Sequence, residues 1–236
     1  VALFIAMFAL PTTTQAQIEY NLAVGGKVVT SDNCNDLSEI DGVSGTVNYE
    51  PKTKTLTLQD ATIEGDIMYA ISSDIYGLKI KVLGTNKITA QAYGIIFSRP
   101  TSIIGDGTLE IVGSDESGIN TSGNMLTVEG CTLNVKGGKF GIRGYDVNHG
   151  EDITVKNAKI TAEGTSEGSI GNIASLAMEG CAIIEPTGAA FDESLHGVAL
   201  NGALVKDKVV IAPASAPVTE YELIIAGTKV NDKNCG

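Results

Sequence analysis

Apolar and polar residues alternate in short runs over most of the chain, and each run changes phase near its middle. The run LTVEGCTLNV (126–135) is an example. If it is extended, one of its faces carries Leu126, Val128, Cys131, Leu133 and Val135. Alternation with a period of two predicts β-strands, and the change of phase at Gly130 predicts a corner between two strands.

The same run recurs six times, which predicts a solenoid. Its marker residues lie 22–27 residues apart and are Leu58, Val82, Ile104, Val128, Val155 and Met178. A second marker repeats as Tyr69-Ala70-Ile71, Tyr93-Gly94-Ile95, Ser117-Gly118-Ile119, Phe140-Gly141-Ile142 and, more loosely, Gly168-Ser169-Ile170. A rise of one strand spacing per repeat, about 4.8 Å, predicts an all-β, right-handed parallel β-helix of about six coils. A leucine-rich repeat would need a Leu-rich strand with its Asn and a half-repeat of helix or turn, which the pattern lacks.

The segments beside the repeat predict caps and a second module. Residues 18–55 read as an N-terminal β cap that contains two hairpins, and 56–213 as the β-helix with its closing strands. Residues 214–220 read as a linker. The string YELIIAGTKVNDKNC (221–235) then matches YNLAVGGKVVTSDNC (20–34) at an offset of 201. Residues 221–236 are therefore expected to begin a second, truncated module of a tandem array.

The first residues predict a truncated secretory signal peptide, 1–17. VALFIAMFAL is apolar and uncharged, and Thr14 and Ala16 are the small residues of a cleavage site. A buried strand or a short membrane anchor is the alternative, although ten apolar residues are too few to cross a bilayer as a helix, which needs about 20. The mature chain is expected to be secreted or on the outer cell surface, without insertion into a membrane.

Charge limits the partners and the chemistry. The chain has 28 acidic and 16 basic side chains and a net charge of −12, so a nucleic-acid backbone would be repelled. It has only two His and no Trp.

Four Cys in an exported protein suggest disulfides. Cys131 and Cys181, however, occupy a small inward corner position, and buried free thiols are the favoured interpretation.

Several strings resemble a group of secreted gut-bacterial right-handed β-helix proteins. They are YNLAVGG with VTSDN, VNYEPKTKTLTLQDATI and GVALNGALVKDKVVI, and the similarity extends over 18–236. Many proteins of that group are labelled carbohydrate-binding, and some are repeated along long surface chains. The resemblance implies the fold, export and a non-enzymatic glycan-binding or adhesive role, with a polysaccharide or a host or bacterial glycan as partner. The strings that carry the resemblance are predicted strands and caps of the fold, and they are not a ligand site.

Enzymes on the same fold are the alternative. A polysaccharide lyase acting on an acidic polysaccharide needs carboxylates to hold Ca²⁺ and a Lys or Arg as base. A hydrolase needs paired carboxylates across one cleft. The predicted outward positions instead carry a polar ladder, Thr57, Lys81, Thr127 and Thr154 on one sheet and Thr62, Thr108, Thr132 and Lys159 on the next. A purely structural surface stalk is a third interpretation.

The candidate binding site is the loop 143–152, an insertion into the longest coil. Tyr145 offers a ring for stacking on a sugar, and Arg143 and His149 offer hydrogen-bond donors. Carboxylates that can accept from sugar hydroxyls are supplied by Asp146, Glu151 and Asp152. No cofactor is expected, and a Ca²⁺ ion bridging these carboxylates to an acidic glycan is the weaker version. A solvated loop without a ligand is the alternative.

Tyr69 and Tyr93 offer a second aromatic pair. A stacking platform is one interpretation, but alternation with Ile71 and Ile95 predicts that both rings point inward as a core stack.

Overall fold

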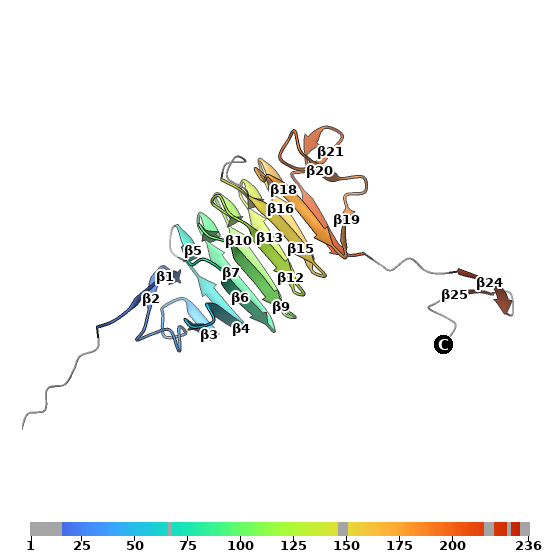
Figure 1. Ribbon diagram of the computed structural model, residues 1–236. Helices are drawn as coiled ribbons and strands as arrows, with labels where there is room; N and C mark the ends of the chain where they lie inside the picture. Colours follow the sequence, from blue (N-terminus) through green and yellow to red (C-terminus); the bar gives the residue numbers. More distant parts are fainter. Residues whose placement is uncertain (1–15, 66–67, 146–150, 215–219, 226–227, 232–236) are drawn as a thin grey trace, which may run out of the picture.

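The structure is a computed structural model that describes residues 16–65, 68–145, 151–214, 220–225 and 228–231 as strands joined by turns (Figure 1). Of the predicted signal peptide, only Ala16 and Gln17 belong to these residues, and both are exposed.

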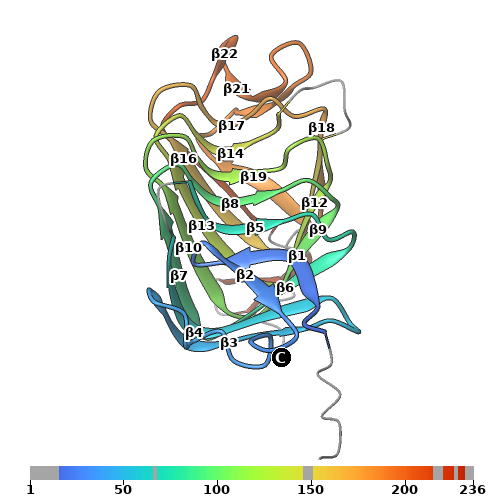
Figure 2. The ribbon, with the colours of Figure 1, turned by 90° about the vertical axis from the view of Figure 1, so that its left-hand side faces the viewer.

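Two large sheets wrap around one apolar core and form a parallel β-helix, which confirms the predicted fold (Figures 1 and 2). The first wall contains β5 (Tyr69–Ser73), β8 (Tyr93–Phe97), β11 (Ser117–Asn120), β14 (Phe140–Arg143) and β17 (Gly168–Gly171). The second wall contains β6 (Leu78–Leu83), β9 (Thr101–Gly105), β12 (Leu126–Glu129), β15 (Asp152–Lys156) and β18 (Ser175–Glu179). The third wall contains β7 (Thr85–Ala90), β10 (Thr108–Gly113), β13 (Thr132–Gly137) and β16 (Lys159–Gly164). The chain passes through the walls in this order for about five turns.

The first of the six predicted coils is a single bent strand, β4 (Thr55–Glu64). Its first half pairs in parallel with β6 and its second half with β7, so it joins the second and third walls into one sheet. The other edge of β4 pairs antiparallel with β3 (Val43–Glu50) in the predicted hairpin. The first copy of the repeat therefore closes the solenoid instead of making a full turn.

Strand register confirms the second sequence marker over its whole length. Ile71, Ile95, Ile119, Ile142 and Ile170 lie side by side on neighbouring strands of the first wall. The first marker is not in register over its whole length. Val128 lies opposite Ile103 and not Ile104, and Val82 lies opposite Gly105, so the copies at Leu58 and Val82 are shifted by two residues relative to those from Val128 onward. Ile103 is fully buried and Ile104 is half-buried.

The core is a set of stacked apolar ladders. Leu109, Leu133 and Ile160 are neighbours on the third wall, and all are fully buried. Asn86 occupies the same ladder below Leu109 and is 1% exposed. Its side chain accepts from the Ala61 N–H and donates to the carbonyls of Leu83 and Thr108, so the buried amide is satisfied. The eight predicted outward residues are all half-buried or exposed.

The two ends of the solenoid are closed by antiparallel strands. At the N-terminal end, β1 (Glu19–Val24) pairs with β2 (Lys27–Thr30) and covers the edge of β5. At the other end, β20 (Ala190–Asp192), β21 (Gly197–Leu200) and β22 (Ala203–Leu204) follow β17. Strand β23 (Lys208–Pro213) inserts antiparallel between β16 and β19 (Cys181–Glu185). The series of parallel strand pairs in the third wall therefore ends at β16.

Residues 220–225 and 228–231 repeat the first hairpin. Strand β24 (Glu220–Ile225) pairs antiparallel with β25 (Thr228–Asn231). Each paired position lies 201 residues after its equivalent in β1 and β2, as in Glu19–Thr30 and Glu220–Asn231. The register irregularity also falls at the same place in both hairpins. The sequence match at this offset thus extends to strand pairing.

Candidate functional site

The candidate loop leaves the first wall at the end of β14 and enters the second wall at β15. Two of its predicted binding residues, Asp146 and His149, lie outside the described residues, which resume at Glu151. The structure places the other four, Arg143, Tyr145, Glu151 and Asp152, at the two stems of the loop.

Arg143 packs against the scaffold. Its guanidinium carbon lies 5.8 Å from the centre of the Phe140 ring, and its Nη1 lies 3.7 Å from Oε2 of Glu116. Lys139 binds the other oxygen of Glu116, and this hydrogen bond raises the pKa of Lys139. The Arg143 side chain is 23% exposed. The predicted hydrogen-bond donor Arg143 therefore contacts Glu116, which lies 27 residues earlier in the chain, on the neighbouring coil.

Tyr145 is the most accessible of the predicted site residues that the structure describes. Its exposed fraction is 68%, and its backbone N–H donates to Oε1 of Glu151 at 3.0 Å. Glu151 is fully buried, and Asp152 accepts a hydrogen bond from the Ser175 hydroxyl. Glu151 thus joins the two stems of the loop, Asp152 joins the C-terminal stem to β18, and the Tyr145 side chain stays exposed.

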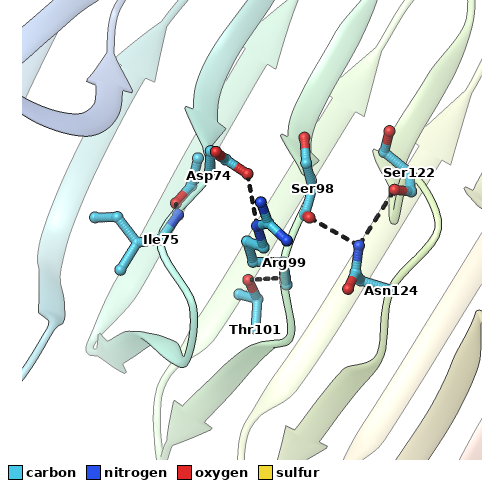
Figure 3. Close-up of polar contacts among 8 residues, drawn as sticks. Asp74, Ile75, Ser98, Arg99, Thr101, Ser122 and Asn124 are labelled. Carbon is cyan, nitrogen blue, oxygen red and sulfur yellow. Dashed lines mark hydrogen bonds and ion pairs between the residues drawn. The ribbon is translucent and has the colours of Figure 1, made fainter.

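The turn that carries Tyr145 belongs to a row of turns between the first and second walls. We call this row the turn edge; it comprises residues 74–77, 98–100, 121–125 and 144–145. Figure 3 shows how side chains link adjacent turns. Arg99 Nε donates to Asp74 Oδ1 at 3.0 Å, and Asn124 Nδ2 donates to the Ser98 carbonyl at 2.8 Å. These contacts fix the turns to one another, and Tyr76, like Tyr145, remains exposed on them.

Tyr69 and Tyr93 do not form the predicted core stack. They are register neighbours on β5 and β8, but both rings are half-buried and neither belongs to the apolar core. A Cβ atom at Gly94 would lie 2.3 Å from Cγ2 of Ile111. The residue after the aromatic ring thus faces the third wall at close range, which keeps the Tyr93 side chain outside the core.

Sequence reasoning missed a hollow of about 410 Å³ beside Tyr69. It lies where β1 covers the edge of the first wall, and its lining includes Tyr69, Asn21, Ser72, Asp74 and Ser98. These residues come from three strands and the turns that follow them, so no sequence window contains them together.

Within the described ranges, no group of three or more His, Cys, Asp or Glu side chains is arranged to hold a metal ion. Nor does any helix in the described part of the chain have the length and apolar character needed to cross a membrane. Comparisons of the chain with known protein families, curated proteins and solved structures give no match. The resemblance to secreted gut-bacterial β-helix proteins remains a prediction.

Proposed function

We propose that this chain is a non-enzymatic β-helix module, secreted or displayed on the outer cell surface, that binds a glycan or acts as an adhesive spacer. The observation that carries the proposal is the exposed Tyr145 ring, fixed to a rigid coil through the buried Glu151. An aromatic ring that stands free of the scaffold can stack on the apolar face of a sugar. Binding residues on loops of a rigid scaffold are a common arrangement.

The partners of nearby carboxylates favour binding over catalysis. Asp74 is paired with Arg99, Glu116 with Lys139 and Arg143, and Asp152 accepts from Ser175. A glycoside hydrolase needs two carboxylates available for proton transfer or nucleophilic attack across a sugar. Carboxylates engaged in scaffold contacts are less suited to that work, which supports the binding role.

The matching hairpins support a tandem array. Strands β24 and β25 repeat the pairing of β1 and β2, which caps the first wall. In the proposed array, β24 and β25 begin the next module in the same way. Several modules on one chain would raise avidity for a repetitive surface glycan without any new contact.

The test is a glycan array with residues 17–214, compared with measurement of product release from pectic and host polysaccharides. Tyr145→Ala should lower the affinity for a bound glycan about tenfold, equivalent to about 1.4 kcal/mol. Tyr76→Ala is the matched control, because Tyr76 is 69% exposed on the same turn edge. Product release from any polysaccharide would contradict the proposal, and the absence of glycan binding would contradict the glycan-binding role and leave only the spacer role.

A further inference from the structure

The hollow beside Tyr69 is a consequence of side-chain size along one row of the outer surface. Val28, Ala23, Ser72 and Ile96 are successive cross-strand neighbours on β2, β1, β5 and β8. The two middle members are small and the two outer ones are large. The row therefore dips over Ala23 and Ser72, and all four residues line the hollow.

The lining of the hollow includes two tyrosines, Tyr20 and Tyr69, together with several hydrogen-bonding residues. The Tyr20 ring packs edge-on against Tyr49, with ring centres 5.2 Å apart, so Tyr69 is the ring left to face a ligand. The half-buried Tyr69 ring stands on one side, and Asn21, Asp74 and Ser98 contribute an amide, a carboxylate and a hydroxyl. Glu19 adds a second carboxylate. This is the composition of a site for a small polyol, because a ring can cover its apolar face while the polar groups bind its hydroxyls.

Backbone and side-chain contacts hold this wall in place. The Asp74 N–H donates to the Asn21 carbonyl at 2.9 Å, which ties β1 to the turn after β5. The Asp74 carboxylate is oriented by Arg99 from the next turn, as Figure 3 shows. A site whose groups are already fixed loses less conformational entropy when a ligand binds.

The charge of the lining selects among polyols. Glu19 and Asp74 are acidic, and none of the described residues that line the hollow is Lys or Arg. An acidic sugar would bring its carboxylate toward Glu19 and Asp74, and Arg99, which pairs with Asp74, does not line the hollow to compensate for the desolvation of a further carboxylate. Carboxylates bind the hydroxyl groups of a neutral sugar as acceptors.

We infer that this hollow is a second carbohydrate site, distinct from the Tyr145 loop and selective for neutral over acidic sugars. The inference rests on the proposed function only in taking the ligand to be a carbohydrate. Tyr69 covers one face of a sugar ring, Asn21 and Ser98 bind its hydroxyls, and Asp74 accepts from one of them.

The experiment is titration calorimetry of residues 17–214 with neutral oligosaccharides selected on the array and with their uronic-acid counterparts. Tyr69→Ala should weaken binding of the neutral ligand about 3- to 10-fold. Tyr93→Ala is the matched control, since Tyr93 is the register neighbour of Tyr69 and does not line the hollow. Ser72→Leu, which fills the floor, should abolish binding at the hollow and leave binding at the Tyr145 loop, while the thermal midpoint stays near that of the wild type. The uronic-acid counterpart should bind at least about tenfold more weakly.

The outcomes separate this inference from the proposed function. If Tyr145→Ala removes binding and both Tyr69→Ala and Ser72→Leu leave it unchanged, the chain binds glycans but not in the hollow. Equal affinity for the neutral and acidic ligands would overturn the selectivity. If the wild type binds no glycan, the proposed glycan-binding role itself fails. A Tyr69→Ala variant that loses its fold is replaced by Tyr69→Leu, which removes the ring and keeps apolar bulk.

Discussion

The thiol of Cys181 lies 3.4 Å from the carbonyl oxygen of Ala158, one coil below it. Cys131 repeats the relationship one coil lower still, with its sulfur 4.0 Å from the Ile103 carbonyl. Ala158 therefore separates the two cysteines along the solenoid axis. Burial also raises the pKa of the Cys131 thiol to about 11, so it is protonated and unreactive at neutral pH.

This separation predicts that Cys131 and Cys181 do not form a disulfide. Two coils place their Cα atoms about 10 Å apart, and a disulfide requires at most about 7 Å. Cys34 is free as well, and Cys235 lies outside the described residues. Mass spectrometry of a non-reduced digest should detect the peptides that contain these cysteines in unlinked form, with free thiols. Recovery of a linked Cys131–Cys181 peptide would show that the coil register is wrong.

A second prediction compares neighbouring residues on β13. Leu133 is fully buried between Leu109 and Ile160, so Leu133→Ala should lower the free energy of unfolding by about 2–5 kcal/mol. Thr132 faces outward, and Thr132→Ala should change it by no more than about 0.5 kcal/mol. Urea unfolding monitored by circular dichroism measures both. Similar urea midpoints for the two variants would contradict the inward and outward assignment.

A third prediction distinguishes two residues at the N-terminal stem of the candidate loop, Arg143 and Tyr145. Arg143→Ala removes contacts with Phe140 and Glu116 and should lower the free energy of unfolding by about 1 kcal/mol. Tyr145→Ala removes an exposed ring and should cost about 0.5 kcal/mol or less. Arg143→Lys keeps the charge but loses the planar group that stacks on Phe140, so an intermediate value is expected. Equal thermal midpoints for Arg143→Ala and the wild type would show that Arg143 is not part of the scaffold.

Alternation along the chain was enough to predict the fold, because each wall repeats the same inward residues. It was not enough to place every residue at the corners. Ile103 and Ile104 are both apolar, and only the pairing with β12 shows which one faces the core. Asn86 is polar in sequence, yet it fills a core position because one backbone group of its own coil and two of the adjacent coils satisfy its amide.

The candidate site depended more on contacts between coils, which a sequence pattern does not contain. Arg143 looked like a free donor, but Glu116 on the preceding coil binds it. The inward prediction for Tyr93 was wrong because the first wall runs so close to Ile111 that Gly94 takes the inner side. Tyr145 is exposed as expected, and its role in binding remains a prediction.

The position of β23 has a mechanical consequence. This strand is hydrogen-bonded along both edges, to β16 and to β19, and it is the last strand of its sheet in the chain. Tension applied through the following segment acts along the strand, so the hydrogen bonds of two ladders are loaded in shear together and do not open one at a time. A module built in this way resists extraction of β23 when tension is applied to the chain that follows it.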